Sequence, residues 1–256
     1  MPITTIIFDV DDTLYDVGSG FTAHRNGYGA ESFMVGHLKF ASTEQAKIVR
    51  DEYFAVYHST AKALTVAQAE GRLPADAPKF DAQDLADWWA EKLDYSLLGG
   101  VDYKLQQDLA ELPLQIVAFS NGPRKYVKRV LKELGVWEYF GDERLFAVDD
   151  TLPHCKPERE AFELIFERIG VKAEECVMVE DSMKNIRKAK ELGMKTVLVK
   201  GRPSEATTAS ESTKPGDKPI ETDPAVDVAI DVIGKMRDVL PSLWVSCPAE
   251  LTTFSK

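Results

Sequence analysis

Short apolar runs alternate with amphipathic segments over the second part of the chain, from about residue 103 onward. Short apolar runs rich in β-branched side chains are typical of strands buried on both faces of a sheet. We expect such strands at 4–8, 115–119, 176–179, 195–199 and 226–230. Helices are expected between the last four of these strands. Strands that alternate with helices imply right-handed crossovers, so the pattern predicts an α/β fold with a parallel sheet.

The segment between the first apolar run and about residue 98 has a helical pattern instead. A capping box at 42–45 opens a continuous helical pattern that reaches Leu64, and Asp81 is placed to cap another helix that carries Trp89. Glycine lowers the helix propensity of 20–40, since each one costs up to about 1 kcal/mol in a helix relative to alanine. Gly27, Gly29 and Gly36 lie within this segment.

These patterns divide the chain into a discontinuous α/β core, 1–15 and 103–245, and an all-α insert, 16–102. The insert leaves the core directly after the first strand and returns near Gly99 and Gly100, which we interpret as hinges. An insert rooted at the rim of an active site is well placed to act as a lid.

Two further segments have little to bury. The stretch 201–225 is rich in serine, threonine, proline and charged residues, and we expect a disordered surface loop there. The tail 246–256 supports no structural prediction.

The formal net charge of −11 argues against binding to polymeric nucleic acid or to an anionic membrane. The three cysteines, Cys155, Cys176 and Cys247, form no C-x-x-C pair, as expected for reduced intracellular thiols. No apolar stretch approaches the roughly 20 residues that span a bilayer. The first strand also begins too close to Met1 for a signal peptide. We therefore expect a cytoplasmic protein; its oligomeric state is not predicted.

Three acids, Asp9, Asp11 and Asp12, follow the first apolar run within four positions. In an extended chain Asp9 and Asp11 point the same way and Asp12 the other way. Clustered carboxylates repel one another unless a cation holds them, which indicates a metal or proton-transfer site. Acids also begin turns and cap helices, so this segment alone leaves both interpretations open.

Polar side chains follow other apolar runs too, with Ser120 and Asn121 after one and Glu180 and Asp181 after another, and Lys156 precedes a helix. The carboxyl ends of parallel strands meet at one edge of the sheet, where these groups can converge. Each type has a use in phosphoryl transfer: a carboxylate as nucleophile, a second acid for proton transfer, and a hydroxyl, amide and lysine for the phosphate oxygens. Singly, each is also a common turn, cap or surface residue.

Together these segments resemble the four motifs of the haloacid dehalogenase-like superfamily of phosphohydrolases. DVDDT at 9–13 is similar to the first motif and FSN at 119–121 to the second. Lys156-Pro157 resembles the third and VEDS at 179–182 the fourth. The resemblance implies a Rossmann-like core, a helical cap formed by the insert, and dependence on Mg²⁺.

The resemblance also implies roles for individual residues. Asp9 would be the nucleophile and Asp11 the general acid/base, with Asp9, Asp11 (through its backbone carbonyl) and Asp181 at the metal. Glu180 is a further possible metal ligand in this interpretation. The phosphoryl group would be held by three residues, Ser120, Asn121 and Lys156.

The insert is similar, over residues 53–64, to a segment of eukaryotic pyrimidine 5′-nucleotidases. His58, Lys62 and Ala63 replace a glycine, an arginine and a second glycine of that segment. We therefore expect Tyr57, His58 and Lys62 to contribute to substrate specificity from the cap.

The combined expectation is a phosphomonoesterase that hydrolyses a small phosphorylated metabolite, a nucleoside 5′-monophosphate first, through an aspartyl-phosphate. A sugar-phosphate or phosphoglycolate phosphatase and a phosphomutase share the same chemistry and stay open. A catalytically silent nucleotide-binding protein is the alternative from another class. A dehalogenase is disfavoured, because its leaving group gives Asp11 no oxygen to protonate.

Overall fold

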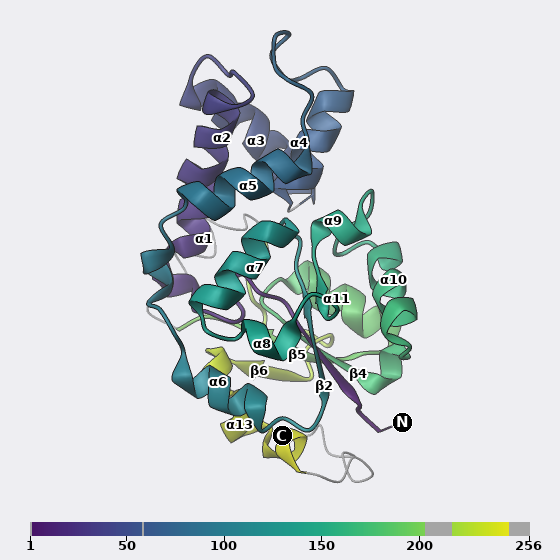
Figure 1. The fold of residues 1–256 in the computed structure, drawn as a ribbon. Helices are drawn as coiled ribbons and strands as arrows, with labels where there is room; N and C mark the ends of the chain where they lie inside the picture. The colour runs from purple at the N-terminus through teal and green to yellow at the C-terminus, as the bar shows by residue number, and fades with distance from the viewer. Residues whose placement is uncertain (1, 58, 203–216, 246–256) are drawn as a thin grey trace.

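The computed structural model describes residues 2–57, 59–202 and 217–245. Its centre is a six-stranded sheet, all parallel, in the order β3-β2-β1-β4-β5-β6 (Figure 1). The strands are β1 (Thr5–Phe8), β2 (Gln115–Phe119), β3 (Leu145–Phe146), β4 (Cys176–Glu180), β5 (Lys195–Val199) and β6 (Val228–Ile230). The fold is therefore α/β and Rossmann-like, and only the two-residue edge strand β3 lacked a signal in the sequence.

The centre of the sheet is the place where the strand order reverses. From β1 the chain runs outward to β3, then returns to place β4 on the other side of β1. Phe8 pairs with Val179, and the Asp9 N–H donates to the Val179 carbonyl at 2.9 Å. In parallel sheets of this order, ligands bind beyond the carboxyl ends of the strands at this switch point.

Helices cover both faces of the sheet, because consecutive residues of a buried strand point to opposite sides. Ile7 packs with Phe162 on one side, whereas Ile6 and Phe8 pack with Val130 on the other. The helices of this part are α6 (Tyr103–Ala110), α7 (Arg124–Glu133), α8 (Trp137–Phe140), α9 (Val148–Thr151), α10 (Arg159–Ile169), α11 (Met183–Leu192) and α13 (Met236–Val239).

A second group of helices stands between β1 and β2 in the chain and forms the upper part of the molecule in Figure 1. They are α1 (Phe21–His24), the π-helical segment η2 (Arg25–Gly29), α2 (Ala30–Gly36), α3 (Thr43–Tyr57), α4 (Thr60–Ala69) and α5 (Ala82–Lys92). Asp81 caps α5 as expected, accepting a hydrogen bond from the Gln83 N–H. We call this group the cap; its exact limits at 16 and 102 stay a prediction.

The glycine-containing segment is helical in spite of its propensity, because it packs closely against α5. A Cβ at Gly29 would lie 2.6 Å from Leu93 Cδ2, and one at Gly36 would lie 2.8 Å from the Trp88 ring. The two glycines are therefore required by the approach of the neighbouring helix, and the tertiary contact outweighs the lower propensity.

The continuous helix expected from residue 42 to Leu64 is wrong, because the structure has two helices, α3 and α4. Ser59 lies between them in an extended conformation, and its Oγ accepts the Lys62 N–H that begins α4. The same hydroxyl donates to the Asn121 carbonyl at 3.1 Å. A cap on the new helix and a contact across to the core thus stabilise the interruption.

Of the predicted loop 201–225, residues 203–216 lie outside the described part, and 217–225 form no helix or strand. The tail 246–256 also lies outside it. Among the described residues, no helix is both long enough and apolar enough to cross a bilayer.

Gly29→Ala should lower the free energy of unfolding by about 1–3 kcal/mol, because the new methyl group overpacks the contact with Leu93. Gly27→Ala is the matched control: it lies in the same π-helical segment, and its Cβ would meet no atom within 4 Å. Denaturant unfolding of both variants checks this. Equal stabilities of the two variants would contradict the close-packing account.

Candidate active site

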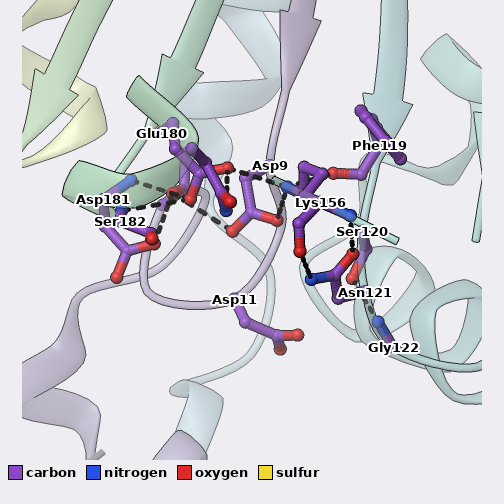
Figure 2. A network of polar contacts seen from close by, with 12 residues as sticks. Asp9, Asp11, Phe119, Ser120, Asn121, Gly122, Lys156, Glu180, Asp181 and Ser182 are labelled. Atoms are coloured by element: carbon purple, nitrogen blue, oxygen red, sulfur yellow. Dashed lines mark hydrogen bonds and ion pairs between the residues drawn. The ribbon is translucent and has the colours of Figure 1, made fainter. Parts of the chain in front are cut away.

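A buried lysine joins the ends of three strands. Lys156 is 1% exposed, and its Nζ donates to Asp9 Oδ1 at 2.6 Å, to the Phe119 carbonyl at 2.7 Å and to Glu180 Oε2 at 2.8 Å (Figure 2). These partners end β1, β2 and β4. The three N–H groups of an ammonium are thereby all used. Lys156 therefore fixes the strand ends relative to one another and neutralises negative charge between them.

Burial by itself lowers the pKa of Lys156, but the charges and hydrogen bonds of Asp9 and Glu180 outweigh it and raise that pKa. The lysine is thus a cation at neutral pH. Its loop is held by Asn121, whose Nδ2 donates to the Lys156 carbonyl and whose Oδ1 accepts the Lys156 N–H, both at 2.9 Å. The Asn121 side chain consequently positions the lysine; its predicted contact with phosphate stays a prediction.

Glu180 is occupied by donors on both carboxylate oxygens. Oε1 accepts the N–H groups of Asp181 at 3.2 Å and Ser182 at 3.1 Å, and Oε2 accepts Lys156 and Asn185 Nδ2. A carboxylate offers about four lone-pair positions, and these contacts use them. Glu180 therefore shapes the turn after β4, and Asp181 is the better candidate for a metal ligand.

The acidic groups beside the lysine fit a hard divalent cation. Oxygen atoms of Asp9, Glu180 and Asp181 all lie within 4.8 Å of one another, and Thr13 Oγ1 lies 3.4 Å from Asp9 Oδ2 and 3.5 Å from Asp181 Oδ1. Carboxylate oxygens at this spacing are the donors that Mg²⁺ prefers, with water completing its octahedron. The donor set thus suits the ion that the sequence predicts.

Asp11 lies apart from this network (Figure 2) and is held from the other side. Its Oδ1 accepts Tyr15 Oη at 2.7 Å and Tyr126 Oη at 2.5 Å, and its Oδ2 forms an ion pair with Arg25. Burial alone would raise the pKa of Asp11, but the Arg25 charge and these hydrogen bonds outweigh it and lower the pKa. Asp11 is therefore an ionised carboxylate in this conformation.

Ser120 follows β2 and is 1% exposed. Its Oγ accepts the Gly122 N–H at 3.0 Å and thereby shapes the turn that leads into α7. Its contact with a phosphoryl group stays a prediction.

Cap and core enclose a cavity of about 50 Å³ at the carboxyl end of the sheet. Asp9, Asp11 and Lys156 are among the core residues that line it, and Asp12 is not among them. The acids follow β1 into a turn, with Asp12 at a φ of 59°, so the alternation predicted for an extended chain is not what places them. The cap side of the lining consists of Arg25, Phe54, Ser59, Thr60 and Trp89.

Two of the three cap residues expected from the sequence, Tyr57 and Lys62, lie outside the cavity lining. Lys62 Nζ reaches the Pro153 carbonyl at 2.6 Å and Glu158, so it ties cap to core outside the cavity lining. Tyr57 is also absent from that lining, and its carbonyl accepts from Cys155 Sγ. His58 lies outside the described residues.

Sequence reasoning missed the cap residues that do line the cavity. Arg25 is a single arginine in a glycine-containing segment, and Ser59 sits at a break that the helical pattern conceals. Trp89 was expected only as cap core; it is 2% exposed and also lines the cavity.

The sequence model of the haloacid dehalogenase-like hydrolases matches residues 3–193. The chain therefore belongs to this family, in agreement with the four motifs. The resemblance of the cap to pyrimidine 5′-nucleotidases stays a prediction.

Among curated proteins, the chain is 26% identical to a glyceraldehyde 3-phosphate phosphatase of Methanocaldococcus jannaschii, over 94% of this chain and 98% of that protein. It is 34% identical to the putative phosphatase YhcW of Bacillus subtilis, over 35% of this chain and 39% of YhcW. A phosphoglycolate phosphatase of Vibrio parahaemolyticus is 32% identical over 34% of this chain and 37% of its own length. The matches to the Bacillus and Vibrio proteins each span less than half of this chain and less than half of the relative.

Solved structures share the fold. A protein described as a predicted phosphoglycolate phosphatase from Haemophilus somnus has a TM-score of 0.60 at 17% identity, covering 93% of this chain and 97% of that chain. The L-2-haloacid dehalogenase from Xanthobacter autotrophicus has a TM-score of 0.55 at 22% identity, covering 93% and 98%. At this identity the likeness establishes the common architecture.

Lys156→Met should destabilise the protein by about 3–5 kcal/mol near neutral pH, because it leaves two buried carboxylates without their cation. In the variant the folded state binds more protons than the unfolded chain, so its stability should fall as the pH rises and recover toward about pH 4, where carboxyl groups take up protons.

Urea unfolding of the variant and the wild type, at neutral pH and at about pH 4, measures the free energy of unfolding and checks this. Lys47→Met is the control, since Lys47 pairs with Asp51 on the exposed surface and its loss should cost less than about 0.5 kcal/mol. A Lys156→Met protein as stable as the wild type at neutral pH would contradict the charge balance described above.

Proposed function

We propose that this protein is a phosphomonoesterase that forms an aspartyl-phosphate on Asp9. The observation that carries the proposal is the Asp9 carboxylate, held by buried Lys156 on the wall of a cavity that Asp11 also lines. A carboxylate oriented by a lysine and facing a cavity can attack phosphorus, and a second carboxyl group on that wall can move the proton.

In the first step an oxygen of Asp9 bonds to phosphorus as the ester P–O bond breaks. Asp11, which must first leave its ion pair with Arg25 and take up a proton, gives that proton to the departing alkoxide. In the second step Asp11, now a carboxylate, takes a proton from the water that attacks phosphorus. The P–O bond to Asp9 then breaks, which returns the carboxylate and releases inorganic phosphate. Lys156 orients the free Asp9 carboxylate for the attack on phosphorus.

Asp9, Asp181 and the Asp11 backbone carbonyl are the groups that we assign to Mg²⁺, following the cluster of carboxylate oxygens at the strand ends. When bound, the ion supplies positive charge against the phosphoryl oxygens. Ser120 and the N–H groups at the start of α7 are assigned to the remaining oxygens.

The acid at position 11 favours an ester substrate over an organohalide, because a halide leaves without a proton. The activities named for the Methanocaldococcus and Vibrio relatives, on glyceraldehyde 3-phosphate and phosphoglycolate, favour a short phosphate ester over the nucleoside monophosphate that the sequence suggested first.

Asp9→Asn should abolish phosphate release, because the amide cannot attack phosphorus. Asp11→Asn should lower kcat by about 10²–10⁴-fold, the usual contribution of a general acid/base. Asp51→Asn, at an exposed cap position, is the matched control and should keep full activity. Phosphate release from a panel of short esters, sugar phosphates and nucleotides measures all three. Full activity of the Asp9→Asn protein would overturn the proposed function.

Mg²⁺ should raise the melting temperature of the wild-type protein, since a ligand that binds only the folded state stabilises it. Asp181→Asn should reduce this increase, and a chelator should stop phosphate release. Glu160→Gln, in a separate acidic group beside His154, is the control and should leave the increase unchanged. An Asp181→Asn protein with the wild-type increase would contradict the assignment of Asp181.

A further inference from the structure

Arg25 brings a positive charge from the cap to the cavity wall. It begins the π-helical segment η2, its side chain is 9% exposed, and it lines the cavity together with Asp9 and Lys156. Single π-helical turns within α-helices are frequent at functional sites, because they redirect one side chain out of the regular helical spacing. The arginine is therefore built into the site as a component of its cap side.

The guanidinium is fixed in orientation. It lies against two aromatic rings, 5.5 Å from the centroid of Trp89 and 5.3 Å from that of Tyr126, and the two rings contact each other edge to face. Its Nε donates to Asn26 Oδ1 at 3.2 Å and its Nη1 to Tyr126 Oη at 3.1 Å. These contacts hold the planar guanidinium, and with it the Nη2 donors, in one orientation, and a guanidinium is the group that pairs best with a carboxylate.

Of the residues that the structure describes, two cations line the cavity, and they differ in the donors that they still offer. Lys156 uses all three N–H groups within the core. Arg25 uses Nε and Nη1, and among the described residues its Nη2 has no hydrogen-bond partner. Arg25 is thus the cation on this wall with hydrogen-bonding capacity for a ligand.

The carboxylate that Arg25 now contacts is Asp11, the proposed acid/base. With Oδ1 held by two tyrosines and Oδ2 by Arg25, both Asp11 oxygens are occupied. A carboxylate on the substrate would compete for the same guanidinium, and its binding would release Oδ2 of Asp11 toward the ester oxygen. A phosphate ester without a carboxylate cannot replace Asp11 at the guanidinium in this way.

We propose that Arg25 is the specificity-determining residue of this site and binds a carboxylate on the substrate, so that the preferred substrate is the phosphate ester of a short hydroxy acid. The inference rests on the proposed function. Arg25 and Asp9 line the same cavity, so a substrate that contacts both carries its carboxylate close to its phosphate.

The test compares two short esters that differ in charge, 2-phosphoglycolate and glyceraldehyde 3-phosphate, on the wild-type, Arg25→Gln and Arg25→Lys proteins. For the wild type, kcat/KM should be at least about tenfold higher for 2-phosphoglycolate, which carries a carboxylate, than for glyceraldehyde 3-phosphate, which does not. This is the ratio that about 1.4 kcal/mol of binding energy gives. Arg25→Gln should lose that advantage, mainly through KM for 2-phosphoglycolate, so that the ratio of kcat/KM between the two esters falls to about one. Both esters share any cost that the loss of the Arg25 ion pair brings to Asp11, so the readout is this ratio. Arg25→Lys should recover part of the preference, since it keeps the charge without the fork.

An equal fall of kcat/KM on both esters in Arg25→Gln would overturn the inference, because Arg25 would then act in the same way whether or not the substrate carries a carboxylate. Absence of a wild-type preference would overturn it as well. Absence of phosphate release from either ester by the wild-type protein would instead overturn the proposed function. Calorimetric binding of 2-phosphoglycolate to Asp9→Asn, with and without Arg25→Gln, gives the same comparison without turnover. Arg25→Gln should weaken binding about tenfold, and unchanged binding would overturn the inference.

Discussion

The ion pairs of Lys156 with Asp9 and Glu180 are the interaction on which the site depends. A buried ammonium is costly unless its charge and all its donors are matched, and here the match is made by groups at the ends of three strands. The strand order places β1 beside β4 and β2, so these groups can meet only because the sheet has this topology. The sheet thus positions the lysine, and the lysine orients the proposed nucleophile.

Cap and core contribute different parts of the chemistry. The core supplies Asp9 and Asp181 directly after strand ends and Lys156 from the loop between α9 and α10, which suits a reaction common to many substrates. The cap supplies Arg25 and Trp89, whose positions depend on how its helices pack. Asp11 stands between the two parts, since it follows β1 yet bonds to Arg25 and to Tyr126 of α7. We therefore assign the proposed reaction to residues of the core and the choice of substrate to residues of the cap.

Much of the core could be predicted from the sequence, because a strand buried on both faces leaves a continuous apolar run and the acids follow it directly. Asp9 and Asp11 were found this way and Lys156 from the resemblance to the third motif, and all three line one cavity in the structure. The edge strand β3 was missed, since two residues carry no periodicity. The cap could not be predicted in the same detail. The position of Arg25 depends on a π-helical segment and on the close approach of Gly29 to α5, which no local pattern encodes. Lys62 was assigned to the substrate from helical spacing, yet it bonds to Glu158 outside the cavity lining.

The most direct test of the central claim is to trap the covalent intermediate on Asp9. The wild-type protein would be mixed with 2-phosphoglycolate or another ester that it hydrolyses, quenched during turnover and treated with borohydride, which reduces an acyl phosphate to the alcohol. Peptide mass spectrometry then identifies the reduced residue. The account predicts homoserine at position 9, formed only with substrate present. Reduction at another residue, or none at position 9 while phosphate is being released, would contradict it.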